Sequence, residues 1–367
     1  MKVEVFDVGQ GDSFLINRQQ SSRFNLVPLL VDLGPQKAKI SDRLQLKNYH
    51  VLLTHSHKDH VGGFPKLYKE KTIESITIPY YLPEIMEIAK FIKNKIPKNI
   101  GSLDWRKIKK IQNVNLVSHG DKLDPDIIVL NPPKSPYHYC SDLIDDERDS
   151  LQEALTILSE YGFDLDIDNI ENYRTPLIFD GFDEEEYSSQ ARIFVHRFFI
   201  GLSKRLVGNP IESVNYYATS HLTLTANQAS IVFKCFDDNG NWLFTGDADE
   251  SVFHRILNEE HYFWYPRPPI AWLYNAISAK FLKVPHHGSR ENINRYILEC
   301  INPDVAIISH NNRKFGGSKD AHPHQEVIDL LDVLNIKSYY TNPVIKSGKT
   351  IKYETKGLVE GGILEFK

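Results

Sequence analysis

Residues 55–60 read His-Ser-His-Lys-Asp-His, directly after a short apolar run that ends at Thr54. Val51, Leu52 and Leu53 predict a buried strand, so the polar hexapeptide lies in the loop that follows this strand. Neutral imidazoles and carboxylates are the ligands that zinc and similar divalent metals prefer. Three imidazoles and one carboxylate in six positions therefore predict a metal site with two half-sites, one on each side of the loop. A solvated polar loop is the alternative interpretation.

Three later segments also place polar residues where predicted strands end. They are Thr245-Gly246-Asp247, Pro285-His286-His287-Gly288 and His322-Pro323-His324. Each alone could be structural, because glycine–aspartate turns are common and a single histidine at a strand end is more often a surface residue. Together they supply the further imidazoles and the carboxylate that a second metal ion needs. The complete set predicts two adjacent metals, with Asp247 able to bridge them.

The composition is that of a soluble globular protein, with 41% hydrophobic and 25% charged residues. No apolar run approaches the roughly 20 residues that a membrane helix requires. Residues 1–6 alternate like a strand, which predicts that no signal peptide precedes the fold. Cys140, Cys235 and Cys300 are widely spaced and favour free thiols in a reducing compartment. We therefore expect a cytoplasmic protein without a membrane partner.

Charge is distributed unevenly along the chain. Residues 141–190 contain 16 acidic residues and only two basic ones, Arg148 and Arg174, a local net charge of −14. The remainder contains 41 basic and 32 acidic residues, a net charge of +9. Regularly spaced leucines in the acidic stretch favour short helices over disorder. We interpret the region at about 134–215 as an acidic insertion, which is a solvated surface, a docking surface for a basic protein, or a DNA mimic that covers the cleft.

Strands and helices are predicted along the rest of the chain. The strands are expected at 3–8, 13–16, 27–31, 75–78, 126–130, 230–235, 242–245, 280–284 and 305–309, and the helices at 66–70, 84–95, 192–206 and 326–334. Asp238-Asn239-Gly240 predicts a hairpin turn. Two strand-rich halves with interleaved helices favour a layered α/β sandwich over a doubly wound parallel sheet. We expect a single domain over residues 1–367 that carries the insertion.

The order of these motifs resembles that of the metallo-β-lactamase superfamily. In detail it is similar to the soluble hydrolase domain of ComEC-like competence proteins, which take up transforming DNA. The segments that carry the finer resemblance are Asp7-Val8-Gly9-Gln10-Gly11-Asp12-Ser13, Leu53-Thr54-His55, Thr245-Gly246-Asp247, the run from Leu282 to Ser289 and the run from His322 to Val327. The resemblance implies a four-layer αββα sandwich, classed as α/β or in some schemes as α+β, with its metal site at one edge between the two sheets.

The resemblance also implies a role for each candidate residue. The implied ligands are His55 and His57 for a first metal, Asp59, His60 and His286 for a second metal, and Asp247 as the bridge. The implied catalytic residues in or beside the substrate cleft are Asp59, His287, His322 and His324. Asp32 matches the family's strand-end aspartate, which orients a histidine ligand. Asp12 lies on a loop that is expected nearby.

One ligand of the general superfamily has no counterpart in this chain. Asn227 occupies roughly the position of a further histidine ligand of the first metal, as it tends to in the ComEC-like subgroup, and His221 lies six residues earlier. The first site could therefore bind metal more weakly, take manganese or magnesium, or be completed by His221. We expect two divalent metal ions, with zinc as the first choice.

Two adjacent metals activate a water molecule and hold the attacking and leaving oxygens. Phosphodiesters depend most on such metals, because their anionic oxygens repel a nucleophile unless they are neutralised. We therefore expect a nuclease or phosphodiesterase that cleaves DNA or RNA. Basic residues between Lys90 and Lys110 would form its phosphate-binding surface, or an ordinary solvated face. Aromatic residues at 261–266 and 272–274 could stack bases, pack in the core or contact a partner. The alternatives are a hydrolase of a cyclic nucleotide, lactone or thioester, and an auxiliary subunit of a DNA-processing or defence complex.

Overall fold

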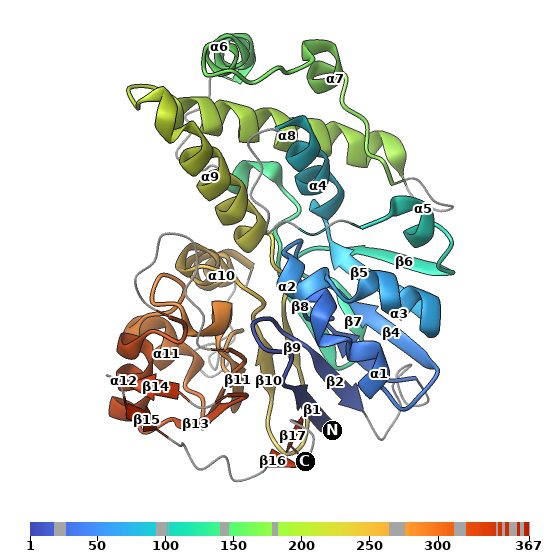
Figure 1. Cartoon of the computed structure of the whole chain (residues 1–367), viewed down its shortest axis with the longest axis vertical. Coiled ribbons are helices and arrows are strands. Elements are labelled where there is room, and N and C mark those ends of the chain that lie inside the picture. The colour runs from blue at the N-terminus through green and yellow to red at the C-terminus, as the bar shows by residue number, and fades with distance from the viewer. Residues whose placement is uncertain are drawn as a thin grey trace.

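Two β-sheets pack face to face in the computed structural model of this chain, with helices on both outer sides and a further helical layer across one end (Figure 1). The structure describes residues 1–17, 27–92, 101, 103–139, 147–177, 183–263, 276–311, 321–342, 344–346, 349–351, 358–359 and 363–366. Within these ranges, no helix has both the length and the apolar character that crossing a membrane requires.

The first sheet has the strand order β16-β17-β1-β2-β3-β4-β5-β6. Its strands are β1 (Lys2–Phe6), β2 (Phe14–Asn17), β3 (Leu29–Val31), β4 (Asn48–Leu52), β5 (Thr72–Pro79), β6 (Asn113–Val117), β16 (Leu358–Val359) and β17 (Ile363–Phe366). β3 to β6 run parallel to one another, whereas β1 runs antiparallel to both of its neighbours. The carboxyl ends of β3 and β4 therefore meet at one edge of the sheet.

The second sheet has the order β13-β12-β11-β10-β9-β8-β7. Its strands are β7 (Lys122–Asp124), β8 (Ile127–Asn131), β9 (Val232–Cys235), β10 (Trp242–Phe244), β11 (Phe281–Lys283), β12 (Val305–Ile308) and β13 (Lys337–Tyr340). β10 to β13 run parallel, and the predicted hairpin joins β9 to β10. A small separate pair consists of β14 (Val344–Lys346) and β15 (Lys349–Ile351).

Twelve α-helices connect and cover these strands within the described ranges. They are α1 (Ile40–Arg43), α2 (Lys58–Val61), α3 (Phe64–Glu70), α4 (Leu82–Phe91), α5 (Trp105–Ile108), α6 (Glu147–Glu160), α7 (Ile167–Glu171), α8 (Glu184–Leu206), α9 (Val214–Gln228), α10 (Glu250–Phe263), α11 (Arg295–Ile301) and α12 (Gln325–Val333). Short 3-10 turns include η1 (Gln36–Ala38) and η6 (Pro285–Gly288).

Side chains alternate between two cores along each strand, and this alternation builds the layers. Leu30 of β3 packs outward with Ile40 of α1 and Phe64 of α3. Its neighbours Leu29 and Val31 pack inward, in the core shared with the second sheet. Helices α10, α11 and α12 form an equivalent outer core on the second sheet. The predicted four-layer αββα sandwich is confirmed.

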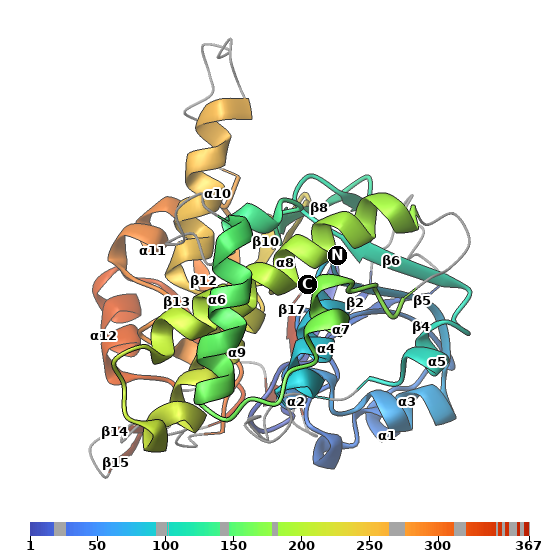
Figure 2. The same cartoon turned by 90° about the horizontal axis from the view of Figure 1, so that it is seen from above.

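The acidic region forms a helical layer of its own. Helices α6, α7, α8 and α9 share one apolar core, to which α4 also contributes. Figure 2 looks down on this layer, and α6, α8 and α9 cross in front of the rest of the molecule. The layer is therefore packed on the sandwich through α4 rather than attached as a loose segment.

A buried carboxylate lies at the contact between α4 and this helical layer. The side chain of Glu84 accepts hydrogen bonds from the hydroxyls of Tyr173, at 3.0 Å, and Tyr187. Burial raises the pKa of Glu84 to about 7, although these hydrogen bonds oppose the shift.

The element boundaries differ from the sequence prediction where capping or composition decides them. The helix expected at 192–206 begins at Glu184, because Asp183 caps it by accepting a hydrogen bond from the backbone N–H of Glu186 at 3.0 Å. Helix α9 was not predicted, since its several threonines lower helix propensity. Cys235 is buried and Cys300 is partly exposed. Cys140 and residues 264–275 of the aromatic segments lie outside the described residues.

Candidate metal centre

The predicted site residues meet where parallel strands of both sheets end. Asp32 follows β3 and the hexapeptide follows β4, while Asp247 follows β10. Thr54 joins the two sheets, because its carbonyl accepts a hydrogen bond from the backbone N–H of Ile231 at 2.8 Å. The carboxyl ends of neighbouring parallel strands lie at the same edge, and this brings together residues that are far apart in the sequence.

The hexapeptide divides into two halves, as predicted. His55 and His57 precede α2, whereas Asp59 and His60 lie within it. A close contact with the loop before β2 fixes this turn. Gly11 has φ +129°, and a Cβ there would lie 2.1 Å from the carbonyl oxygen of Asp59. Only glycine fits this position, because any side chain would displace α2.

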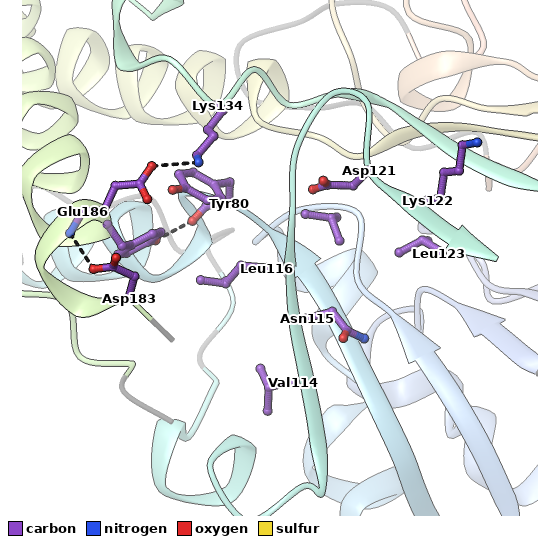
Figure 3. Close-up of a pocket in the computed structure, with 12 residues that line it drawn as sticks. Tyr80, Val114, Asn115, Leu116, Asp121, Lys122, Leu123, Lys134, Asp183 and Glu186 are labelled. Carbon is purple, nitrogen blue, oxygen red and sulfur yellow. Dashed lines mark hydrogen bonds and ion pairs between the residues drawn. The ribbon is translucent and has the colours of Figure 1, made fainter. Parts of the chain in front are cut away.

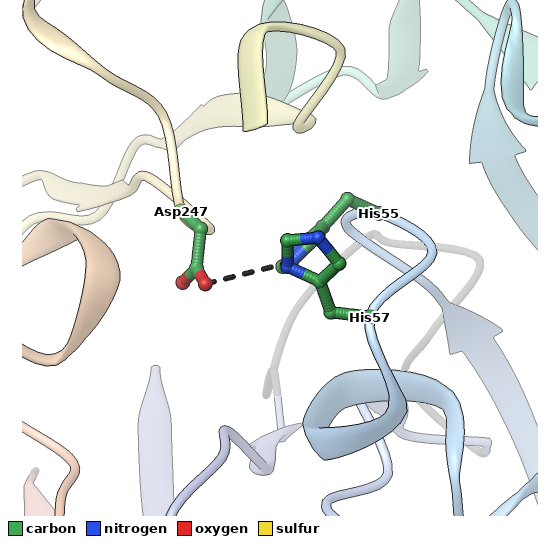
Figure 4. A group of neighbouring side chains, drawn as sticks. All are labelled: His55, His57 and Asp247. Atoms are coloured by element: carbon green, nitrogen blue, oxygen red, sulfur yellow. Dashed lines mark ion pairs between the residues drawn. The ribbon is translucent and has the colours of Figure 1, made fainter. Parts of the chain in front are cut away.

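The first group consists of His55, His57 and Asp247, whose candidate ligand atoms all lie within 4.8 Å of one another (Figure 4). All three side chains are buried, and His55 Nε2 lies 3.5 Å from Asp247 Oδ2. Burial, assisted by the charge on His55, lowers the pKa of His57 to about 3. Burial likewise lowers the pKa of His55. Both imidazoles are therefore neutral at pH 7, the form that binds metal.

The second group consists of Asp59, His60 and His287. His287 Nε2 lies 3.4 Å from Asp59 Oδ2, and His60 Nε2 lies 3.4 Å from Asp247 Oδ1. Burial opposes ionisation of Asp59, but its contact with the His287 ring and the nearby charges of His60 and His287 outweigh this effect and lower its pKa. Asp247 Oδ2 also lies 3.9 Å from His287 Nε2, so the carboxylate of Asp247 lies between the two groups, where a bridging ligand would stand.

Asp32 orients His60, the role that the resemblance implied for it. Asp32 Oδ2 lies 2.7 Å from His60 Nδ1. The same carboxylate accepts hydrogen bonds from the backbone N–H and the hydroxyl of Thr54, at 2.8 and 2.7 Å. Fixing Nδ1 in this way leaves Nε2 of His60 directed at the centre.

The structure groups His287, rather than His286, with Asp59 and His60. His287 is fully buried, and its Nδ1 lies 2.9 Å from the carbonyl oxygen of Ser309. His286 is more exposed, and its Nε2 lies 3.8 Å from Asp247 Oδ2. Both histidines adopt left-handed backbone conformations in η6, with φ of 45° and 56°. Because of this turn both rings face the centre, which corrects the sequence-based division into one ligand and one cleft residue.

His322 and His324 occupy different positions at the edge of the centre. The rings of His322 and His286 have centroids 5.2 Å apart. Burial, together with the charge on His286, lowers the pKa of His322 to about 2, so that it is neutral. His324 Nδ1 instead accepts a hydrogen bond from the backbone N–H of Arg290 at 2.9 Å. His322 is therefore the better placed of the two to meet a substrate.

His221 belongs to the helical layer rather than to either metal group. Its Nε2 lies 3.1 Å from the carbonyl oxygen of Phe198, and its ring packs on that phenylalanine. Six residues along α9 correspond to about 9 Å, which separates His221 from the position of Asn227. Asn227 is buried, and its Oδ1 has no hydrogen-bond partner among the residues that the structure describes. The suggestion that His221 completes the first site is not supported.

Sequence reasoning missed Lys283, which is buried inside the centre at 1% exposure. Its ammonium forms an ion pair with Asp12 and donates a hydrogen bond to the carbonyl oxygen of Gly246 at 2.6 Å. Burial alone would lower the pKa of Lys283, but Asp12 and Asp247 outweigh it and raise this pKa. A lysine between Leu282 and Val284 in a central strand was the available signal, because such a position is normally apolar.

The residues of the centre fit divalent metal ions. Nε2 of His55, His57, His60 and His287, and Oδ1 of Asp247, are buried without a hydrogen-bond partner in the described part of the chain. Unpartnered buried polar atoms are unfavourable, and several of them converging on one place indicate a missing ligand. Imidazole and carboxylate donors suit zinc and, with fewer imidazoles, manganese or magnesium.

A separate pocket of about 460 Å³ lies between β6, β7 and the start of α8 (Figure 3). Lys134 forms an ion pair with Glu186 across it, with Nζ 3.0 Å from Oε1. None of the candidate site residues lines this pocket.

Comparison with known proteins agrees with this geometry. The family model described as "Metallo-beta-lactamase superfamily" matches residues 29–146, which include the whole hexapeptide. The match covers one part of the chain and supports the resemblance to the metallo-β-lactamase superfamily seen in the sequence.

Two individual proteins are similar to parts or all of the chain. ComE operon protein 3 of Bacillus subtilis (strain 168) is 29% identical over 135 residues, which cover 36% of this chain and 14% of that protein. The chain thus matches only a small part of this curated relative. A crystal structure described as Tm1679, a metal-dependent hydrolase of the beta-lactamase superfamily, aligns over 93% of this chain and 95% of its own, with 10% identity and a TM-score of 0.42.

Proposed function

We propose that this protein is a metal-dependent hydrolase that cleaves phosphodiester bonds in DNA or RNA. The observation that carries the proposal is the position of Asp247, whose carboxylate lies between two groups of buried histidines and contacts both. We propose that each group holds one divalent ion, zinc in the first place. Two such ions, when bound, supply an activated water and neutralise the charge of a phosphodiester.

The chain's own residues would hold the metal ligands in place and contact the leaving group. The carboxylate of Asp32 holds His60, and the carbonyl of Ser309 holds His287, so neither ring needs to reorganise during turnover. His322 lies beside His286, the most exposed histidine of the centre. We assign to the neutral imidazole of His322 a hydrogen bond from its ring N–H to the leaving oxygen.

Exposed basic residues near the centre would bind the phosphate backbone. Lys58 lies within the hexapeptide and is exposed. The backbone N–H of Gly101 donates to the carbonyl oxygen of Ser56 at 2.7 Å, so the chain passes beside the hexapeptide shortly before α5. Arg106 and Lys110, in and just after α5, are exposed. Positive charge along this path favours a polyanion over a small neutral ester.

The acidic helical layer offers a second surface, for a basic protein partner. Exposed carboxylates gather on α7, on the segment before it and at the start of α8. They are Asp164, Asp166, Asp168, Glu171, Asp183, Glu185 and Glu186. Deletion of residues 141–190 is a poor test of this surface, because the segment shares a core with α4. Charge reversal at Asp164 and Glu171, which are exposed and do not cap α7, leaves that core intact and should weaken binding of a basic protein.

The proposed activity is tested by measuring metal content together with cleavage. The protein is freed of metal with a chelator, reloaded with zinc, manganese or magnesium, and incubated with single-stranded and duplex DNA and RNA. We expect cleavage that requires metal and is lost in Asp247→Asn. Turnover of a cyclic nucleotide, lactone or thioester without any cleavage of nucleic acid would refute the nuclease proposal. Full metal occupancy without turnover of any of these substrates would instead favour an auxiliary subunit.

A further inference from the structure

Lys283 is a buried ammonium in the middle of the metal centre, and the chemistry proposed above does not use it. It stands on β11, in the interior of the second sheet. Its Nζ forms an ion pair with Asp12, donates to the carbonyl oxygen of Gly246, and lies 3.7 Å from Asp247 Oδ1. A buried charge is tolerated only where it is paired and hydrogen-bonded, and these three contacts meet that requirement.

The same carboxylates belong to a third possible metal group. In the part of the chain that the structure describes, Asp12, His60 and Asp247 also bring candidate ligand atoms within 4.8 Å of one another. Both carboxylates of this third group contact the ammonium of Lys283. A divalent ion would have to bind beside a fixed positive charge, which opposes its entry.

The contacts of Asp247 show what the ammonium does to the other two groups. Asp247 Oδ1 lies 3.4 Å from His60 Nε2 and on the side of Lys283. Asp247 Oδ2 faces His55 Nε2 at 3.5 Å. The contact with Lys283 thus favours the rotation of the carboxylate in which Oδ1 faces His60, and Oδ2 faces His55 and His287.

We propose that Lys283 is a positioning residue whose ammonium occupies the third cation position of the centre, so that metal enters only the other two groups and Asp247 is held between them. The proposal rests on the two-metal centre of the proposed function. It does not depend on which bond the protein hydrolyses.

Counting metal ions tests this proposal without any measurement of activity. Three proteins are compared: wild type, Lys283→Met, and the double variant Asp12→Asn with Lys283→Met. Each protein is loaded with zinc and separated from free zinc by gel filtration. Mass spectrometry then gives the number of zinc ions per chain. Lys280→Met is the matched control, because Lys280 is exposed and donates to the carbonyl oxygen of Asn239, away from the centre. Circular dichroism establishes that each variant is folded.

We expect two zinc ions per chain in wild type and in Lys280→Met. We expect three in Lys283→Met, where Asp12 loses its ion pair and can bind a further ion that shares the bridging carboxylate of Asp247. The double variant should return to two, because the amide that replaces the Asp12 side chain supplies no carboxylate to the third group. The single variant Lys283→Met leaves the buried carboxylate of Asp12 without its ion-pair partner, and the double variant removes this charge. The double variant therefore provides a folded comparison if Lys283→Met is unstable.

Two results would overturn the role of Lys283: two ions in a folded Lys283→Met, or three ions in the double variant. A wild-type chain that binds no zinc, manganese or magnesium would overturn the metal centre itself. The failure of the proposed function is thereby separated from the failure of this inference.

Discussion

The buried carboxylate between α4 and the helical layer makes stability depend on pH in a defined direction. Burial raises the pKa of Glu84 from its ordinary value of 4.5 to about 7. A carboxyl group with a raised pKa in the folded state stabilises the fold when it is protonated, and this stabilisation is lost as the pH rises through the folded pKa. Between pH 5 and pH 8, the shift corresponds to a loss of about 2 to 3 kcal/mol in the free energy of unfolding.

Glu84→Gln removes this titration and keeps the shape of the side chain, although its single amide oxygen can replace only one of the two acceptors that Tyr173 and Tyr187 use. The cost of the lost hydrogen bond is the same at both pH values. The assay is urea unfolding of wild type and Glu84→Gln at pH 5 and pH 8, at the same metal concentration. Any other group that titrates between these pH values does so in both proteins, and the difference between the two pH profiles isolates Glu84. We expect the variant to gain about 2 to 3 kcal/mol relative to wild type on going from pH 5 to pH 8. Parallel profiles for the two proteins would refute the reasoning.

Three further predictions concern the centre. Asp32→Asn should weaken zinc binding by about 10- to 100-fold in a competition titration with a chelator, because His60 loses its orienting partner; unchanged affinity would contradict this role. Gly11→Ala should lower the melting temperature and the metal content together, because its Cβ would lie against the carbonyl oxygen of Asp59. Gly120→Ala is the control, because Gly120 also has a positive φ but has open space around it. His322→Ala should reduce kcat by about 100-fold with zinc content unchanged, whereas His324→Ala should reduce it less.

The sequence predicted the site residues that directly follow a strand. Parallel strands place their carboxyl ends at one edge, so the hexapeptide after β4 and Asp247 after β10 could be combined from the sequence alone. Local composition was sufficient there, because each motif followed a recognisable apolar run.

Two features of the centre were beyond local sequence reasoning. His286 and His287 both face the centre because consecutive residues are left-handed, a conformation that non-glycine residues rarely adopt. Lys283 depends on Asp12, which lies far away in the sequence and approaches only when the two sheets pack together. Contacts of this kind follow from tertiary structure, and no periodicity in the sequence indicates them.

Each metal group combines residues from both sheets, and this has a consequence for the lifetime of the protein. His55 and Asp59 follow a strand of one sheet, and Asp247 and His287 follow strands of the other, so bound ions would hold the two sheets together. Each ion that binds only the folded chain adds about 2.7 kcal/mol at a free concentration 100 times its dissociation constant. A chain deprived of metal would open more often and be degraded sooner. Proteolysis would in this way remove the inactive molecules first.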